Sequence, residues 1–452
     1  MNKSREVDMI HGPLLGRMVF FAMPLAVSSI LQHLFNSADV AVVGRFAGSD
    51  ALAAAGSCSA LVGIFVNLII GLAVGPNACL ARLIGERRRD EISGMVHTTV
   101  TFGGLLGLAL MAAGMLAARP ILVLSATPER ILPQAMTYIL IYFAGLPFIT
   151  LFNFGAAVLR SVGDTKRPMY CLLLSGAVNV ALNLVFVIAF HWGVAGVAAA
   201  TTLSNLLACG MVLAFLRGME GEFTLRARRL RVEKAHLVRI LRVGVPAGLQ
   251  GGVFSFSNLF IQSGINTFGA DAIAGASVGL NFEYFTYDIV TAFAQAVITF
   301  TGQNYGAGDL KRCRRVFLTG MGCAFLITEA LSLIFLARLD LFVGLYTSSA
   351  EVARYAVLRF MRVALWEGFT ASYEISAAAL RGLGRSAVPA ILTVIGTVVF
   401  RPVWLMTVFR AWPRYETIMD VYIVSWLFTG AMVTCAYLRH MKRLEREMAD
   451  RQ

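Results

Sequence analysis

The sequence LRSVG at 159–163, followed by Pro168, returns 221 residues later as LRGLG at 380–384, followed by Pro389. The same offset aligns DALA at 50–53 with DAIA at 271–274, and an offset of 222 aligns Pro24 with Pro246. Two halves with matched turns predict two similar bundles of helices. An internal duplication in an apolar chain is typical of transporters, in which one half rocks against the other around a central cavity.

The composition indicates an integral membrane protein. Apolar residues make up 58% of the 452 residues, charged residues make up 14%, and the mean hydropathy is +0.72. A soluble domain of this size could not cover so much apolar surface. We therefore predict an all-α integral membrane fold with twelve transmembrane helices in two pseudo-symmetric six-helix bundles around a central cavity. The expected spans are 18–43, 51–79, 94–118, 132–158, 169–190, 194–216, 240–266, 272–301, 316–337, 351–379, 388–409 and 417–438.

The distribution of charge predicts the orientation and the domain boundaries. Most of the 39 Lys and Arg residues lie at the termini and in the even-numbered loops, which the positive-inside rule places in the cytoplasm. We expect a first lobe at 1–217, a cytoplasmic basic linker at 218–239, a second lobe at 240–438 and a cytoplasmic tail at 439–452. The basic cluster from Arg217 to Arg242 is interpreted as a solvated linker against anionic lipid, without nucleic-acid binding. A monomer in the cell (inner) membrane, with both termini cytoplasmic, is expected.

Several functional classes lack their sequence signatures. The chain has no G-x-x-x-x-G-K-[ST] phosphate-binding loop, and its seven cysteines show no C-x-x-C spacing. We expect no enzyme activity, no metal framework and no cofactor. The energy for transport is then expected to come from an ion gradient or from a partner subunit.

The first span carries a polar stripe that is out of place in lipid. Gln32, Asn36 and Asp39 follow one another at steps of four and three residues, on one helical face. A carboxylate near the bilayer centre costs about 2.5–3.5 kcal/mol, so such residues usually line a cavity or bind an ion. The alternative is an aspartate at a helix end that faces head groups, since Gly44 and Arg45 follow closely.

The fifth span repeats the pattern with Ser175, Asn179 and Asn183. Amide oxygens are neutral, hard ligands, and one carboxylate with several such oxygens suits either a proton or Na⁺. Thr201 in the sixth span and Asn153 in the fourth span could complete the set. Ordinary hydrogen bonding between helices is the alternative reading of these residues.

Several motifs in order resemble the multidrug and toxic compound extrusion (MATE) family over nearly the whole chain. They are NSAD at 36–39, GLPF at 145–148, LRSVGDTKRPM at 159–169, GVAGVAAATT at 193–202 and GQNYGAGD at 302–309. The resemblance implies an exporter of amphiphilic, often cationic compounds in exchange for Na⁺ or H⁺. It also implies that Asp39 is the acid of a cation site with Asn179, Asn183 and Thr201. Asn183 departs from the pattern, because relatives often carry an Asp there. A site with a single carboxylate binds Na⁺ less permanently. If Na⁺ is the coupling ion, Asp39, Asn179 and Thr201 would be its ligands.

The second half does not copy this chemistry, since Asp39 aligns with Ile261. Its seventh span offers Asn258 and Gln262, and acids and aromatics follow in later spans. We predict a substrate cavity that combines the first-half residues Gln32, Asn36 and Asn153 with Asn258, Gln262, Glu283, Tyr287, Asp288 and Glu374. Glu374 is interpreted either as a substrate-facing charge or as half of an ion pair, with Arg401 as its potential partner. An acid beside an aromatic ring suits a cationic amphiphile.

The expected cycle depends on Asp39 and Pro24. Neutralising Asp39 with an external cation would let the first helix bend at Pro24 and displace the bound compound outward. A lipid-linked oligosaccharide flippase of the same superfamily is the alternative function, for which a more cationic cavity is expected. A membrane enzyme or receptor is a more distant alternative.

Overall fold

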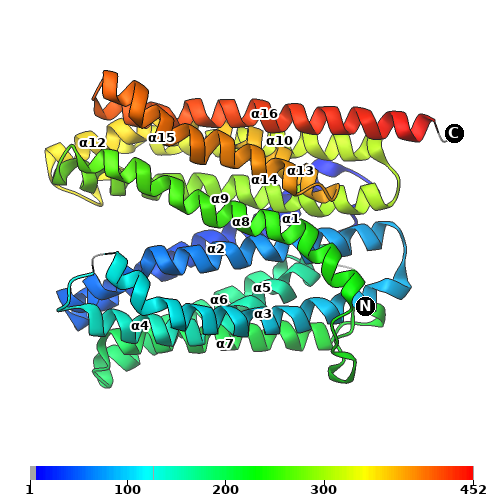
Figure 1. The fold of residues 1–452 in the computed structure, drawn as a ribbon, viewed down its shortest axis with the longest axis horizontal. Helices are drawn as coiled ribbons and strands as arrows, with labels where there is room; N and C mark the ends of the chain where they lie inside the picture. Colours follow the sequence, from blue (N-terminus) through cyan, green and yellow to red (C-terminus); the bar gives the residue numbers. More distant parts are fainter. Residues whose placement is uncertain (1–6, 126, 451–452) are drawn as a thin grey trace. The chain divides into compact units, whose positions relative to one another are not determined.

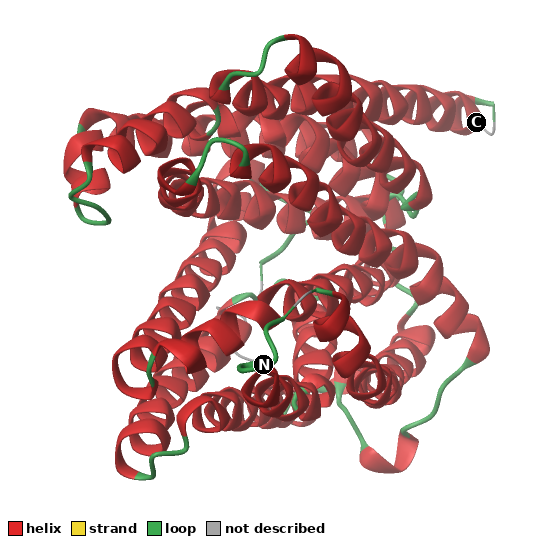
Figure 2. Cartoon of the chain, turned by 60° about the vertical axis from the view of Figure 1, so that its left-hand side comes forward, coloured by secondary structure: helices red, strands yellow, loops and turns green. Residues whose placement is uncertain are grey.

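The computed structural model describes residues 7–125 and 127–450. Within these ranges the chain is made of helices joined by short turns, and no strand occurs (Figures 1 and 2). The described chain divides into two compact units. Unit 1 holds Val27–Gly248, and unit 2 holds Asp8–Ala26 together with the chain from Leu249 onward.

The helices of unit 1 follow the first half of the sequence. They are α1 from Val27 on (α1 is Leu14–Val42), the π-helix η1 (Val43–Ala47), α2 (Ser49–Gly85), α3 (Arg89–Leu124), α4 (Leu132–Ala144), α5 (Leu146–Ser161), α6 (Lys166–Leu184), the π-helix η2 (Val185–Ala189), α7 (Gly193–Arg217), the 3-10 turns η3 (Gly221–Phe223) and η4 (Ala227–Arg229), and α8 (Lys234–Asn266) up to Gly248.

Unit 2 takes the start of α1 and the remaining helices. They are the rest of α8, α9 (Ala270–Gly306), α10 (Leu310–Ala337), α11 (Leu339–Gly344), α12 (Ala350–Arg362), the 3-10 segment η5 (Ala364–Thr370), α13 (Ala371–Gly382), α14 (Ala387–Thr393), the π-helix η6 (Val394–Val399), α15 (Phe400–Trp404), the π-helix η7 (Leu405–Phe409) and α16 (Tyr415–Ala449).

Ten helices in the described chain are long and apolar enough to cross a membrane. The two further spans expected from the sequence, 272–301 and 351–379, fall on α9 and on α12 with η5 and α13. α9 carries the acids Glu283 and Asp288 within its apolar stretch, whereas the second segment is divided by the 3-10 stretch η5 into helices of 13 and 12 residues. The length of each segment still matches a membrane crossing.

Two prolines lie where long helices pass from one unit to the other. Unit 2 gives way to unit 1 after Ala26, two residues beyond Pro24, and unit 1 gives way to unit 2 after Gly248, two residues beyond Pro246. Proline has no N–H, so each position lacks one hydrogen bond of the helical ladder. Both helices are therefore weakened at the point where their packing partners change. The lobe boundaries expected at 217 and 240 remain a prediction about membrane domains.

Close glycine contacts hold the start of α8 against α2 inside unit 1. A Cβ atom on Gly71 would lie 2.5 Å from the Cα atom of Gly248, and one on Gly75 would lie 2.4 Å from the carbonyl oxygen of Ile240. Only glycine allows the two backbones to approach so closely. The spacing Gly71-x-x-x-Gly75 therefore serves helix packing.

Candidate functional site

A glycine brings α1 and α6 close together in unit 1. A Cβ atom on Gly176 would lie 2.0 Å from the Phe35 ring, so the missing side chain is what leaves room for that ring. Asn179 and Asn183 follow Gly176 on the same face of α6, at steps of three and four residues. Asp39 follows Phe35 by one turn of α1. The contact at Gly176 thus sets the spacing at which the polar side chains meet.

The four residues expected to bind the coupling cation form one chain of hydrogen bonds. The Asn183 side-chain amide donates to Asp39 Oδ1, and the same nitrogen lies 3.4 Å from Asn179 Oδ1. Asn179 Nδ2 in turn donates to Thr201 Oγ1 at 3.4 Å, and the Thr201 hydroxyl donates to the carbonyl of Val197 at 3.0 Å. The half-buried carboxylate of Asp39 is therefore held by neutral groups, and no cationic side chain in the described part of the chain pairs with it.

The side-chain oxygen of Asn183 accepts no hydrogen bond in this arrangement of the described residues. The Asn183 side chain is 0% exposed, and its Oδ1 atom has no hydrogen-bond partner among the described residues. A buried amide oxygen without a partner is unfavourable by about 1–3 kcal/mol, so a proton donor or a cation at this point would be stabilised. With the amide reversed, Oδ1 would accept from a protonated Asp39. The one side chain can thus serve both charge states of the carboxyl group.

Two π-helical segments lie directly after this site. η1 begins four residues after Asp39, and η2 begins two residues after Asn183. Their valines pack in one apolar cluster with the start of α7, formed by Val42, Val43, Ala51, Val187, Val194 and Val197. π-Helical turns are frequent at functional sites, because the extra residue turns side chains out of the regular register. Here the cluster fixes the ends of α1 and α6 that carry Asp39 and Asn183.

The remaining polar candidates of the first half lie outside this chain. Gln32 and Asn36 are exposed and have no recorded contact with the four residues. Asn153 is half-buried and donates to the carbonyl of Ile149 in its own helix at 2.9 Å. The buried Pro24 lies within α1.

Glu283 forms a buried ion pair in unit 2. Arg359 Nε lies 2.5 Å from Glu283 Oε1 and Arg359 Nη2 lies 2.8 Å from Oε2, with side-chain exposures of 4% and 9%. Glu283 and Tyr287 lie one turn apart on α9, but the carboxylate of Glu283 contacts Arg359 of α12. The reason is that α12 packs against α9 and brings a guanidinium group to the carboxylate.

Tyr287 and Glu374 meet instead. The Tyr287 hydroxyl donates to Glu374 Oε1 at 2.8 Å, and both residues are half-buried. The expected partner of Glu374, Arg401, donates to Asn258 Oδ1 at 2.9 Å. The acid and the aromatic hydroxyl that a cationic compound would contact therefore come from α9 and α13.

Two candidates of the second half lie apart from these contacts. Gln262 donates to Asn266 Oδ1 at 2.9 Å on the exposed side of α8. Asp288 is buried, at 9% exposure.

The sequence pattern did not single out Tyr422, which lies beneath two arginines. Its ring centroid is 5.4 Å from the Arg359 guanidinium carbon and 4.7 Å from that of Arg401. Arg401 is 0% exposed and also lies 5.3 Å from the Phe254 ring. Cation–π contacts of this kind stabilise a desolvated guanidinium group. The signal available in the sequence was two arginines inside apolar spans.

Comparisons with known proteins agree with this architecture. The MatE family model matches residues 24–185 and 246–405, one match in each half and together more than half of the chain. The probable multidrug resistance protein YoeA of Bacillus subtilis is 28% identical over 385 residues, covering 83% of this chain and 83% of that protein. The probable multidrug resistance protein YpnP of the same organism is 32% identical over 318 residues, covering 68% of this chain and 69% of that protein.

Solved structures show the same fold. An outward-facing structure of a multidrug resistance MATE family transporter of the MOP superfamily superposes with a TM-score of 0.91 at 21% identity, over 98% of this chain and 99% of that one. The fold is therefore the expected one, with twelve transmembrane helices in two six-helix bundles. The two family matches, one per duplicated half, and this likeness over the full length show that the chain belongs to the MatE family, whose members are multi-pass membrane transporters and not enzymes.

Proposed function

We propose that the protein is a secondary antiporter that exports amphiphilic, often cationic organic compounds in exchange for H⁺ or Na⁺, with Asp39 as the coupling residue. The observation that carries the proposal is the Asp39 carboxylate in an apolar helix, held by Asn183 in a chain of neutral groups. A carboxylate in this setting changes its interactions strongly on neutralisation, because the uncompensated charge is unfavourable in lipid. The relatives named above as multidrug resistance proteins support the cargo class.

The chain of hydrogen bonds is compatible with either coupling ion. A proton would bind Asp39 and be accepted by Asn183 Oδ1 after the amide reverses. Na⁺ would use oxygen ligands from Asp39, Asn179 and Thr201, and the partnerless oxygen of Asn183 could add a fourth. A site with one carboxylate and otherwise neutral oxygens is expected to bind its cation weakly, so that the cation can exchange. Apart from the coupling ion, we propose no cofactor.

Neutralisation of Asp39 would act on α1. Pro24 lies two residues before the point where α1 passes from unit 2 to unit 1. Because proline has no N–H, the helix already lacks one backbone hydrogen bond there, and bending at Pro24 does not have to break it. We propose that cation binding lets the Asp39 end of α1 repack on α6 while the start of α1 stays in unit 2. The cargo is then displaced outward, and the cation is released as a new compound binds.

The acid and aromatic groups of unit 2 supply contacts for a cationic cargo. Glu374 and the Tyr287 hydroxyl are half-buried and bonded to each other, so a cation can compete for the carboxylate. Glu283 is not available in this way, because both of its oxygens are engaged by Arg359. Gln32, Asn36 and Asn258 are the exposed polar residues that we propose line the route of the cargo.

A lipid-linked oligosaccharide flippase is the competing function. Its pyrophosphate would require guanidinium groups free to bind it. Arg359 is engaged by Glu283, and Arg381 Nη2 donates to Gln250 at 2.9 Å. These pairings favour the antiporter.

Transport in proteoliposomes tests the proposal. A permanently charged quaternary cation is used as cargo, because an acidic interior would trap weak bases without any transporter. The membrane potential is clamped with valinomycin and equal K⁺, and an interior rich in H⁺ or in Na⁺ is imposed separately. We expect the wild type to accumulate the cargo under one of the two gradients, and Asp39→Asn to accumulate none.

Asp50→Asn is the matched control. It makes the same chemical change at a carboxylate that is 41% exposed and ion-paired with Arg130. We expect it to transport as the wild type does. Unimpaired accumulation by Asp39→Asn, at equal protein per liposome, would show that Asp39 is not the coupling residue.

We also propose a monomer in the cell (inner) membrane, with both termini in the cytoplasm and membrane lipid as its surroundings. The excess of Lys and Arg at the termini and in alternate loops supports this orientation. Labelling of single cysteines introduced near each terminus with a membrane-impermeant reagent tests it. Labelling in intact cells would place that terminus outside.

A further inference from the structure

A cavity of about 820 Å³ lies at one end of unit 1, away from the coupling residues. Three segments line it: the turn between α2 and α3 (84–92), the turn between α5 and α6 (162–167) and the segment 218–223 after α7. The volume is in the range of small-molecule sites. None of Asp39, Asn179, Asn183 and Thr201 lines it.

Arg87 lies in a turn whose backbone conformation favours glycine. Arg87 has a φ of 57°, a conformation that non-glycine residues rarely adopt. The duplicated turn of the second half has Gly308 at the corresponding position, with a φ of 79°. The same turn can therefore be made with glycine, which adopts this conformation without steric cost. Residues in such sparsely populated backbone conformations cluster at binding and active sites.

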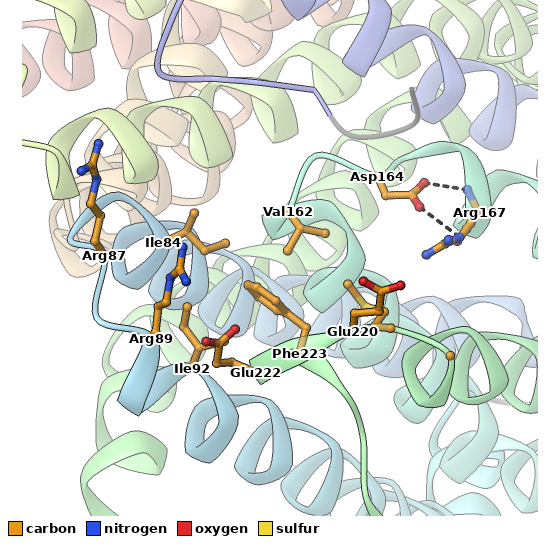
Figure 3. A pocket seen from close by; sticks show the side chains of 13 residues that line it. Ile84, Arg87, Arg89, Ile92, Val162, Asp164, Arg167, Glu220, Glu222 and Phe223 are labelled. Carbon is orange, nitrogen blue, oxygen red and sulfur yellow. Dashed lines mark hydrogen bonds and ion pairs between the residues drawn. The ribbon is translucent and has the colours of Figure 1, made fainter. Parts of the chain in front are cut away.

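The charges around the cavity are arranged unevenly. In the view of Figure 3, Arg87, Arg89 and Glu222 lie on one side, and Asp164, Arg167 and Glu220 lie on the other, so the first side carries a net positive charge and the second a net negative charge. Asp164 is 2% exposed and is neutralised by Arg167, whose backbone N–H it also accepts at 3.0 Å. Within residues 7–125 and 127–450, the exposed Arg87 and Arg89 form no ion pair, and Arg89 begins α3, which has no side-chain cap. Ile84, Val162 and Phe223 supply apolar surface between the two sides.

We propose that this cavity binds a phosphoethanolamine group, with its phosphate at Arg87 and Arg89 and its ammonium group at Glu220. Guanidinium groups bind phosphate through paired, charge-assisted hydrogen bonds, and the start of α3 adds the positive end of its dipole. The apolar surface of Ile84 and Phe223 would contact the glycerol part of a phospholipid. The group can come from phosphatidylethanolamine or from a soluble phosphate ester. Either source would tie the two turns and the segment after α7 together.

Native mass spectrometry of the delipidated full-length protein tests the proposal. The protein is titrated separately with short-chain phosphatidylethanolamine, phosphatidylglycerol, phosphatidylcholine and soluble O-phosphoethanolamine. We expect phosphatidylethanolamine to bind at least about tenfold more tightly than the other two lipids, the ratio that 1.4 kcal/mol produces. If O-phosphoethanolamine at equal concentration displaces phosphatidylethanolamine, the ligand is a soluble phosphate ester. If it does not displace the lipid, the ligand is phosphatidylethanolamine. Both outcomes support binding of a phosphoethanolamine group in the cavity.

Arg87→Gly is the decisive variant, because glycine suits the backbone at this position. We expect it to melt at or above the wild-type temperature and to bind the same probes at least about tenfold more weakly. Arg228→Gln removes the same charge from the exposed turn η4, outside the cavity, and is expected to bind as the wild type does. Glu220→Gln is expected to lose the preference for ethanolamine over glycerol. Unchanged binding by Arg87→Gly, or equal binding of phosphatidylethanolamine and phosphatidylglycerol by the wild type, overturns the proposal.

Discussion

Glu283→Gln tests whether the carboxylate of α9 stabilises the fold or binds cargo. In the structure both of its oxygens receive hydrogen bonds from Arg359, at 2.5 and 2.8 Å, and the two side chains are 9% and 4% exposed. The variant would leave the guanidinium group buried without its counter-ion. Breaking a buried pair by removing one partner destabilises a protein by about 3–5 kcal/mol.

The surroundings of Arg359 place the expected loss near the lower end of that range. Its guanidinium group retains the contact with the Tyr422 ring at 5.4 Å. Glutamine can still accept one hydrogen bond. We therefore expect Glu283→Gln to lose about 3 kcal/mol of unfolding free energy.

Unfolding of the purified protein in mixed micelles, followed as denaturing detergent is added, measures this loss. The double variant Glu283→Leu with Arg359→Met removes both charges and keeps much of the apolar volume. We expect it to recover most of the stability, because replacing a buried ion pair by apolar side chains is often neutral. Transport per folded molecule is expected to stay within a few-fold of the wild type. A Glu283→Gln protein as stable as the wild type but inactive in transport would contradict this reasoning and return Glu283 to the cargo site.

Two further changes probe contacts within unit 1. Gly176→Val would push α6 away from the Phe35 ring, because a Cβ atom at this position would lie 2.0 Å from the ring, and we expect it to reduce transport and protein yield. Adding Phe35→Ala should restore both. Failure of this rescue would show that the contact is unimportant. His97→Phe should speed amide hydrogen exchange of the segment after α7 by ten- to a hundredfold, since the His97 Nε2 atom accepts the Arg226 N–H at 3.1 Å and such a bond is worth about 1–3 kcal/mol. His97 Nδ1 lies 2.7 Å from the Ser93 carbonyl, to which it can donate, and this leaves Nε2 as the acceptor. Exchange that is unchanged by the substitution would contradict this reasoning.

The hydrogen-bonded group of the first half could be expected from the sequence because its members repeat along helices, while its role as a cation site stays a prediction. Asn179 and Asn183 lie one turn apart, and Asp39 follows Gln32 and Asn36 at steps of seven and three residues. Period and chemistry together pointed to the residues that the structure connects. The closeness of α1 and α6, in contrast, depends on Gly176, and a glycine in a chain with 42 of them carries no signal of its own.

The second-half contacts could not be predicted by the same reasoning. The spacing of Glu283 and Tyr287 along the helix does not identify their partners, which come from α12 and α13. Periodicity determines which side chains share a face, but the neighbour across that face depends on which helix packs there. The π-helical segments and η5 were also not foreseen, because they result from tertiary packing that overrides a regular helix.

The duplication gives the two halves one scaffold with opposite electrostatic roles. At the positions corresponding to Asp39, Asn183 and Thr201, the second half has Ile261, Trp404 and Tyr422. No titratable carboxyl replaces Asp39 there, and Tyr422 instead stacks beneath the permanently charged Arg401. A guanidinium group keeps its charge throughout any cycle, whereas a carboxylate held only by amides can take up a cation and release it. Under the proposed function, the first half is then the one that changes charge, while the buried pairs of the second half keep its charges fixed.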